Sequence, residues 1–256
     1  MSFGLGHGRA LDPGLGVVGV GPEELPPLPD TILEDPESGR VDPRAWFERP
    51  ERPFEIEIGS GKGAFLIQQG ALEPETNFLG IEWAGEFYAY AADRVRRRRE
   101  ADASLDNIRL LCADASEFLR WRCPAGIVRV IHLYFSDPWP KARHHKKRVI
   151  QDRFLGEAFR VLEPGGELRV VTDHDGLWAW DVEHFDRWTA SPPPDPSVGG
   201  VTSGHPAFTR HAFDAPESAG ESELVGTNFE RKFRREGRSF HATVLRRFAP
   251  PGASTT

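Results

Sequence analysis

The sequence predicts an α/β fold in which a mostly parallel sheet carries helices on both faces. Short apolar runs of strand character alternate with helical stretches from residue 54 onward, and a glycine-rich turn follows the first run. The chain has 256 residues, enough for one large domain with a substantial core. Hydrophobic residues make up 39% and charged residues 28%, so wholesale disorder is not expected.

Strands and helices are expected in alternation, a pattern that favours parallel strand pairing. The expected strands are 54–58 (FEIEI), 77–82 (NFLGIE), 108–112 (IRLLC), 127–135 (IVRVIHLYF) and 167–172 (ELRVVT), with a final strand over 239–248. The expected helices are 63–72, 84–100 and 151–162. Gly165 and Gly166 are expected to end the last of these helices before the next strand begins.

The composition changes along the chain and sets the expected domain limits. Residues 1–50 contain 8 Gly and 8 Pro, which predicts a flexible N-terminal extension. The folded domain is expected over 51–248. Residues 189–223 are rich in Pro, Ser and Gly and are interpreted as a surface insertion, and 249–256 as a disordered tail.

Several classes of protein are disfavoured by composition. The longest apolar runs are too short for a membrane-spanning helix, and the first residues lack the pattern of a secretory signal. Cys112 and Cys123 cannot build a disulfide framework or a four-ligand zinc site, so neither a metal nor an oxidising compartment is expected. A cytoplasmic location is the default expectation.

The net charge of −7 argues against a nucleic-acid partner only if the charges are evenly spread. They are not: residues 94–99, 141–148 and 231–238 hold 15 of the 32 Lys and Arg, and the only acid among them is Glu236. These three segments are expected to draw RNA if the fold gathers them on one face. For 94–99, a solvated helix face and an RNA contact remain equally open.

A glycine turn (EIGSGKG) follows the first expected strand. Gly59, Gly61 and Gly63 allow a ligand to approach the backbone closely at a helix N-terminus, and they are the expected cofactor-binding glycines. A phosphate-binding P-loop needs Ser or Thr directly after Gly-Lys, where this chain has Gly63. A dinucleotide site remains formally possible. The carboxylate of Glu57 favours S-adenosylmethionine, because it suits a cationic amino-acid group and would repel a pyrophosphate.

Two further acids stand where an adenosine would need them. Glu82 ends the second strand, within reach of the ribose hydroxyls, and Asp114 follows the third strand, within reach of the adenine amino group. Each acid alone is more simply a solvated residue at a strand end. Three acids at the carboxyl ends of three consecutive parallel strands favour the cofactor interpretation.

The most informative stretch follows the fourth strand and reads FSDPWPKARHHKKR (135–148). Two prolines around Trp139 fix a rigid, non-helical loop, which holds Asp137 at the carboxyl edge of the sheet. Five basic residues and two histidines follow Asp137 with no acid among them. The start of a charged helix would account for each of Lys146, Lys147 and Arg148 taken alone. It does not explain why an acid, an aromatic residue and seven basic or imidazole residues occur together here.

With these residues in view, the sequence resembles the bacterial tRNA (guanine-N7-)-methyltransferases over about residues 46–248. The resemblance depends on EIGSGKG, FLGIE, FSDPWPKARHHKKR, LEPGGELRVVTD and TNFERKFRREG. It implies a Rossmann-like class I methyltransferase fold with a mostly parallel seven-stranded sheet. It also implies S-adenosylmethionine as methyl donor and guanine 46 of the tRNA variable loop as acceptor. Ser136 stands where the family usually has proline.

The resemblance also implies roles for individual residues. The cofactor-contacting acids are then Glu57, Glu82, Asp114 and Asp137, with Asp137 also the catalytic residue. The substrate-binding residues are Lys141, Asp173, Thr227, Asn228, Phe229 and Glu230. The RNA contacts are Arg143, His144, His145, Lys146, Lys147 and Arg148. The partner implied is tRNA, bound by a monomer or a homodimer.

The chemistry of guanine N7 shapes the role expected of Asp137. This nitrogen has a free lone pair and no proton, so its attack on a sulfonium methyl group needs alignment rather than a strong base. Asp137 is therefore expected to orient the base or the cofactor. Trp139 is a candidate to stack on the extruded guanine, and a packing role within the loop is equally open.

Three other functions stay open on sequence alone. One is methyl transfer to a different RNA or to a small molecule, which the basic loop disfavours. A second is RNA binding without catalysis, which the intact acids disfavour. The third and weakest is a nicotinamide-dependent dehydrogenase.

Overall fold

The computed structural model describes residues 4–6, 8–102, 104–191, 194, 205–221 and 223–249. The chain divides into two compact units, Met1–Pro124 with Pro216–Thr227 and Ala125–Ala215 with Asn228–Thr256. Its strands form a seven-stranded sheet in the order β3-β2-β1-β4-β5-β7-β6, which is mostly parallel as predicted. None of the described helices has the length and apolar character needed to cross a membrane.

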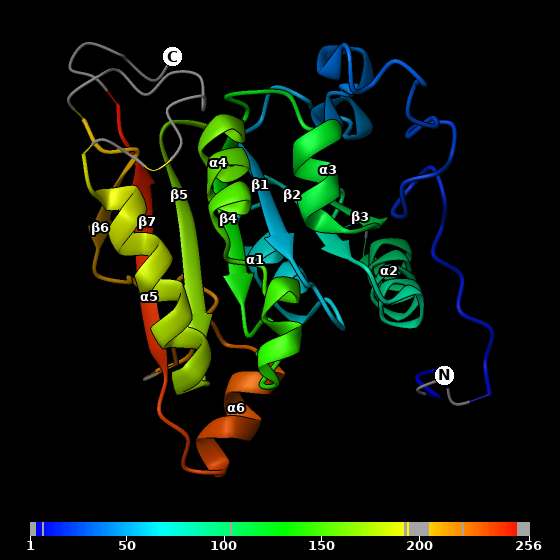
Figure 1. Ribbon diagram of the computed structural model, residues 1–256. Coiled ribbons are helices and arrows are strands. Elements are labelled where there is room, and N and C mark those ends of the chain that lie inside the picture. The colour runs from blue at the N-terminus through cyan, green and yellow to red at the C-terminus, as the bar shows by residue number, and fades with distance from the viewer. Residues whose placement is uncertain are drawn as a thin grey trace. The chain divides into compact units, whose positions relative to one another are not determined.

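The first unit contains three parallel strands whose bounds match the predicted ones. They are β1 (Phe54–Ile58), β2 (Asn77–Glu82) and β3 (Ile108–Cys112). Helix α1 (Ala64–Leu72) joins β1 to β2, and α2 (Gly85–Asp102) joins β2 to β3. Helix α3 (Ala115–Trp121) follows β3 and was not predicted. Figure 1 shows α1 behind the strands of this unit and α3 in front, so helices cover both faces.

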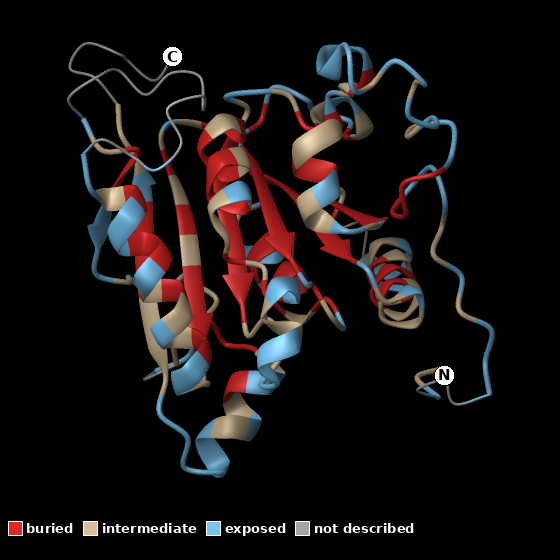
Figure 2. Cartoon of the chain, viewed as in Figure 1, coloured by how far each residue is buried: buried red, intermediate tan, exposed pale blue. Residues whose placement is uncertain are grey.

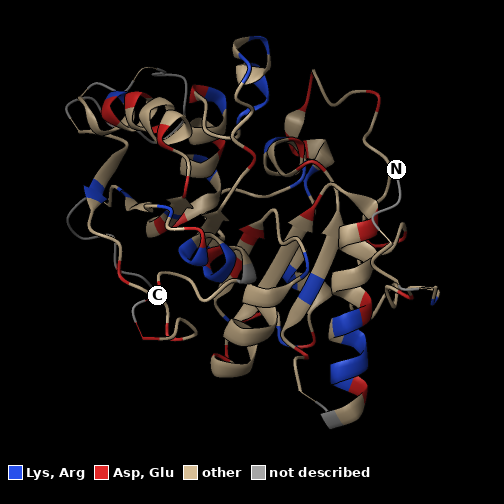
Figure 3. Cartoon of the chain, turned by 90° about the horizontal axis from the view of Figure 1, so that it is seen from below, with Lys and Arg blue, Asp and Glu red and all other residues tan. Residues whose placement is uncertain are grey.

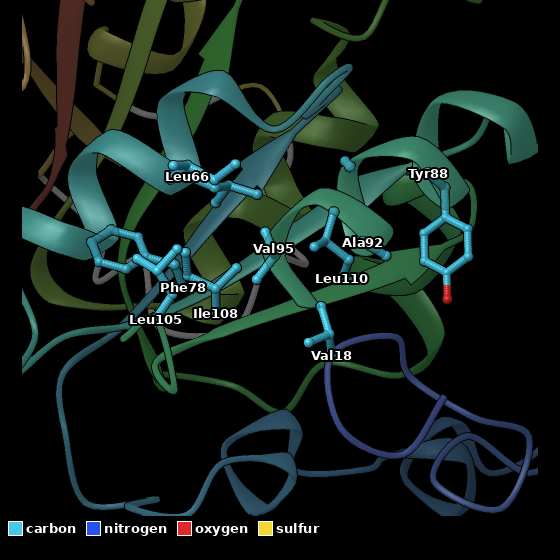
Figure 4. Close-up of a cluster of buried hydrophobic side chains, with 11 residues drawn as sticks. Val18, Leu66, Phe78, Tyr88, Ala92, Val95, Leu105, Ile108 and Leu110 are labelled. Atoms are coloured by element: carbon cyan, nitrogen blue, oxygen red, sulfur yellow. The ribbon is translucent and has the colours of Figure 1, made fainter. Parts of the chain in front are cut away.

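Helices α1 and α2 pack on β2 and β3 through a continuous cluster of buried apolar side chains (Figure 4). Its buried members are Val18, Leu66, Ile67, Phe78, Tyr88, Ala91, Ala92, Val95, Leu105, Ile108 and Leu110. Gly80 in β2 allows this close packing, because a Cβ atom there would lie 2.4 Å from Cδ1 of Leu66. The position of α1, which begins directly after the glycine turn, therefore depends on a glycine in the neighbouring strand.

The N-terminal segment packs against the outer edge of β3. The Val20 amide donates to the Leu110 carbonyl at 2.8 Å, and the Leu110 amide donates to the Val18 carbonyl at 2.9 Å. Val18 is fully buried. Two short 3-10 helices follow, η1 (Pro36–Gly39) and η2 (Pro43–Trp46). The segment is thus attached to the first unit at residues 18–20, while its predicted flexibility stays a prediction.

The second unit contains a mixed four-stranded part of the sheet. Its strands are β4 (Val128–Tyr134), β5 (Leu162–Thr172), β6 (Phe208–His211) and β7 (His241–Arg247). β4 and β5 are parallel, whereas β7 is antiparallel to both β5 and β6. In Figure 2, buried residues run along the strands and exposed residues mark the outer helix surfaces.

Helices α4 (Asp152–Val161) and α5 (Asp175–Thr189) cover one face of this second unit (Figure 1). A short 3-10 helix, η3 (Ala142–Lys147), precedes α4, and α6 (Asn228–Arg235) precedes β7. Neither α5 nor α6 was predicted as a helix.

Two expectations for the second unit differ from the structure. β5 begins at Leu162, before the glycine pair, because Gly165 and Gly166 lie inside an irregular stretch of the strand where the register against β4 shifts. β6 lies within 189–223, where no strand was predicted, and Phe208 is fully buried. The described part of that range therefore includes a strand with a core residue; 192–193, 195–204 and 222 lie outside the described residues, as do 250–256 of the predicted tail.

Candidate functional site

The predicted site residues are divided between the two units. The first unit holds Glu57, the glycine turn, Glu82, Asp114 and Thr227. The second unit holds Asp137, Lys141, residues 143–148, Asp173, Asn228, Phe229 and Glu230. Each group is described within its own unit.

The glycine turn between β1 and α1 has the backbone conformation that its composition predicts. Gly59, Gly61 and Gly63 all have positive φ, at 75°, 52° and 67°, a region that other residues rarely adopt. Gly63 is the N-cap of α1 and has no side chain to occupy the helix N-terminus. The turn therefore leaves backbone accessible next to a helix start, as close binding of a ligand requires.

Glu57, near the end of β1, is buried without a compensating charge. Its side chain is 5% exposed, and among the described residues Oε2 has no hydrogen-bond partner. Burial, reinforced by the negative charge of Glu82, raises the pKa of Glu57 to about 8. The hydroxyl of Ser60, also buried, lacks a partner in the same part of the chain. A cationic group that donates hydrogen bonds would satisfy both side chains.

Glu82, at the end of β2, holds the glycine turn in place. Its carboxylate accepts hydrogen bonds from the amides of Gly61 and Ala84, both at 2.9 Å. Each oxygen retains a second lone pair that a hydroxyl group can use. Glu82 is thus placed to connect the turn, β2 and any ligand bound between them.

Asp114 follows β3 and caps α3. Its Oδ1 atom accepts from the amides of Ser116 and Glu117 at 2.8 and 3.1 Å. Asp114 is exposed, and so is Cys112 at the end of the same strand. Because Cys112 pairs with Glu82 across β2 and β3, these side chains follow neighbouring strand ends, as the sequence predicts for the acids.

The Asp137 loop leaves β4 through strained backbone. Phe135 and Trp139 both have positive φ, 55° and 42°, and they are two of the three non-glycine residues in the described chain with this conformation. Asp137 lies between them and is exposed. Strain on both sides of one exposed carboxylate is typical of a functional position that the surrounding structure holds in place.

Trp139 is half-buried and contacts the basic segment that follows it. Nζ of Lys147 lies 4.5 Å from the centre of its ring, and His144 meets the ring edge-on at 5.9 Å. These contacts favour the packing role of Trp139. Lys141, at the N-cap of η3, is exposed.

The basic segment 143–148 contains one residue unlike the others. Arg143, Lys146 and Lys147 are exposed, and the two histidines are half-buried, whereas Arg148 is only 4% exposed. Five of the six predicted RNA contacts are therefore at least partly accessible, and the sixth is in the interior.

Asp173, at the end of β5, lies beside the Asp137 loop, because β4 and β5 pair up to Tyr134 and Val171. Its carboxylate receives a 2.5 Å hydrogen bond from Arg238, a partner 65 residues away that has no local sequence signal. His174 accepts from the amide of Leu177 through Nδ1 and so caps the N-terminus of α5.

Helix α6 contains both buried and exposed members of the predicted substrate-binding set. Glu230 is fully buried and pairs with Arg234 at 2.7 Å. Phe229 is 48% exposed. Thr227 is 8% exposed and belongs to the first unit, and the side chain of Asn228 lies outside the described residues.

The arginine run on α2 colours much of that helix blue in Figure 3. Three of its arginines, Arg96, Arg97 and Arg99, form ion pairs within the chain. Asp93 accepts from Arg9, Arg96 and Arg97, and its side chain is fully buried. Arg99 pairs with Glu48 at 2.6 Å. These contacts favour a structural role for most of the run, because the paired arginines are already committed to carboxylates.

A family model and the sequences of curated proteins both identify relatives of this chain. A family described as "Putative methyltransferase" matches residues 51–191. A tRNA (guanine-N(7)-)-methyltransferase of Streptococcus equi subsp. zooepidemicus is 31% identical over 217 residues, covering 84% of this chain and 90% of that protein. One of Nitrobacter hamburgensis is 41% identical over 160 residues, covering 62% of this chain and 60% of that protein.

Among solved structures, an aminoglycoside resistance methyltransferase matches with 18% identity and a TM-score of 0.48, covering 86% of this chain and 94% of that one. This likeness is too remote to bear on function. The family match covers more than half of the chain, and the Streptococcus relative extends it over most of the remainder. The chain belongs to the tRNA (guanine-N(7)-)-methyltransferase family.

Proposed function

We propose that this protein transfers the methyl group of S-adenosylmethionine to N7 of guanine 46 in the variable loop of tRNA. The observation that carries the proposal is the similarity to a relative of that name over 84% of the chain. The arrangement of the first unit supports the choice of donor, and the arrangement of the second unit supports an RNA acceptor.

The first unit fits S-adenosylmethionine. Glu57 and Ser60 offer buried, unpartnered oxygens that would hold the cationic amino-acid end. Glu82 would accept from the ribose hydroxyls with its remaining lone pairs, and Asp114 would face the adenine. When bound, S-adenosylmethionine supplies a methyl group on a positively charged sulfur. The protein has only to hold this group in line with the acceptor nitrogen.

The second unit fits a guanine brought in on RNA. Asp137 lies between two residues of strained conformation, which persist only where the surrounding structure restrains the loop after β4. Positive charge moves onto the purine as the methyl group is transferred, and a fixed carboxylate stabilises that charge. Asp137 and Asp173 would also accept from the N1–H and N2–H₂ edge of guanine. The exposed cations of 143–147 would contact the phosphate backbone.

Methylation of tRNA tests the proposal. The protein is incubated with an unmodified tRNA transcript and methyl-labelled S-adenosylmethionine, and 7-methylguanosine is then mapped along the product. We expect the label at position 46 and none in a transcript with adenine there. Label at another guanine would refute the position, and label in another RNA but not in tRNA would refute the substrate. A deletion strain, with and without this gene, extends the test to the cell.

The role of Asp137 has its own test. If it orients the base or the cofactor, Asp137→Asn lowers the single-turnover rate by about 10- to 100-fold at every pH, because misalignment does not depend on a proton. A wild-type rate that falls with a carboxylate pKa absent from Asp137→Asn, together with rescue of the variant by added base, would establish proton removal instead.

A further inference from the structure

Arg148 has surroundings that differ from those of the other cations in its segment. It ends the run that the family resemblance assigns to RNA contact, yet only 4% of it is exposed, whereas Arg143, Lys146 and Lys147 are exposed. A phosphate group cannot reach a guanidinium that is already enclosed by protein. Contact with the RNA backbone therefore does not explain why an arginine occupies position 148.

The guanidinium of Arg148 bridges two segments of the second unit. Nε donates to the Pro138 carbonyl at 2.9 Å, and Nη1 donates to the Gly176 carbonyl at 3.2 Å. Pro138 directly follows Asp137, and Gly176 lies in the first turn of α5, three residues after Asp173. One side chain thus connects the loop that carries Asp137 to the segment that follows Asp173.

Packing fixes the guanidinium in this position. Its central carbon lies 5.3 Å from the centre of the Trp180 ring, and the Trp180 indole nitrogen donates to the Ile150 carbonyl at 2.7 Å. The Arg148 carbonyl accepts from Gln151 at 2.6 Å. Asp181, buried next to Trp180, interacts electrostatically with the Arg148 charge. Both the backbone and the side chain of Arg148 are therefore restrained.

The bond to Pro138 acts on the peptide that immediately follows Asp137. With strained backbone at Phe135 and Trp139, this loop stays in place only if its surroundings restrain it. Arg148 supplies such a restraint through a charged, planar donor with fixed geometry.

We propose that Arg148 is a positioning residue that fixes the Asp137 loop for methyl transfer, rather than a contact to the RNA backbone. This inference rests on the proposed function of the same site. It divides the cations of the basic segment into two groups: Arg143, Lys146 and Lys147 are exposed and available to the RNA, and Arg148 faces inward to the loop.

Kinetics and binding of the full-length protein separate the two roles. For Arg148→Lys we expect the single-turnover rate at saturating tRNA to fall about 10- to 100-fold, because lysine cannot reproduce both directed hydrogen bonds. The tRNA Kd should stay within about twofold, and the slope of log Kd against log salt should stay unchanged. Lys146→Ala is the matched comparison at an exposed cation of the same segment: it should weaken tRNA binding and reduce the slope by about one, which Arg148→Lys should not do.

Hydrogen exchange gives a readout that does not need activity. Arg148→Lys should accelerate exchange of the amides at 136–141 and leave those of β1 to β3 unchanged, with a cooperative thermal transition retained. Loss of affinity with a reduced salt slope, and unchanged exchange in the loop, would assign Arg148 to the RNA and overturn the proposal. If the wild-type protein methylates no tRNA, the proposed function fails, while the exchange result still decides whether Arg148 restrains the loop.

Discussion

The Glu57 carboxyl is buried at the end of β1, and its pKa is raised to about 8, mainly by burial. At neutral pH most molecules without ligand therefore carry this group protonated. A bound ammonium group reverses the balance, because it stabilises the ionised form. Binding of the cofactor amino acid is then coupled to release of a proton.

This coupling predicts how affinity depends on pH. Binding of S-adenosylmethionine should tighten as pH rises from 6 toward 7.5, by up to about tenfold per pH unit, and weaken again at higher pH, where the ligand's own α-amino group, with an ordinary pKa of about 7.7–8.0, loses its proton. Glu57→Gln should bind weakly and lose the dependence. Calorimetry in two buffers of different ionisation enthalpy measures the proton released. A wild-type affinity that stays flat from pH 6 to 8 would contradict the assignment of Glu57.

Asp181 predicts a pH effect on stability instead. Burial raises its pKa to about 8, against the opposing effect of Arg148, and Oδ1 lacks a partner among the described residues. The unfolded carboxyl ionises near its ordinary pKa of about 3.9. The unfolded state thus loses its proton first, and this group makes stability fall as pH rises from about 4 to 8.

Asp181→Asn should remove that dependence. Its thermal midpoint relative to wild type should increase steadily between pH 5 and pH 8, which calorimetric or dichroism melts can follow. Asp186→Asn, at an exposed position of the same helix that faces Arg210, is a control that should not change the slope. If the thermal midpoints of Asp181→Asn and wild type changed with pH in parallel, the buried carboxyl would be ionised in the folded protein, and the prediction would be wrong.

Elements could be predicted where pattern and packing agree. β1, β2 and β3 are short apolar runs between turn residues, and they are buried along nearly their whole length, so their bounds match the prediction. β6 was missed because it lies in a Pro, Ser and Gly-rich stretch and is held by pairing with β7, a contact distant in sequence. Helix α5 was missed because its aromatic residues do not follow a simple apolar stripe.

In the candidate site, too, features that depend on contacts distant in sequence could not be predicted. The acids and the glycine turn could be predicted, because strand ends and glycines have local signals. The buried state of Arg148 could not, since nothing in KARHHKKR distinguishes it from its exposed neighbours. Ser60 lies inside the glycine motif, and only the structure shows that its hydroxyl lacks a partner.

At the level of elements, Asp93 on α2 binds the N-terminal segment through its ion pair with Arg9. Hydrogen bonds from Arg9, and to a smaller extent from the α2 arginines, hold the pKa of Asp93 well below its usual range. The contribution of Asp93 to the free energy of unfolding is therefore present above about pH 4 and is lost as pH falls. Asp93→Asn should lower the free energy of unfolding by about 2 kcal/mol. Glu100→Gln, which affects an exposed pair with Arg96, should cost less than about 0.5 kcal/mol. Chemical denaturation checks both; equal effects would show that Asp93 has no special role.

At the level of the whole molecule, the distribution of charge predicts the salt dependence of tRNA binding. The combined variant Lys146→Ala and Lys147→Ala should reduce the slope of log Kd against log salt by about two. Arg96→Gln with Arg99→Gln should leave the slope unchanged, because these arginines are already paired with carboxylates. Filter binding from 50 to 200 mM salt measures both. A reduced slope in the second variant would place α2 on the RNA.

The pairing of residues 18–20 with β3 also affects self-association. β3 is the outer strand of its sheet, and such a strand offers unpaired amides and carbonyls to the strands of other chains. Here the amide and carbonyl of Leu110 are both used by the protein's own N-terminal segment. A chain shortened to begin after residue 21 would expose them. We therefore expect the shortened chain to self-associate more readily through this edge than the full chain, which light scattering can measure.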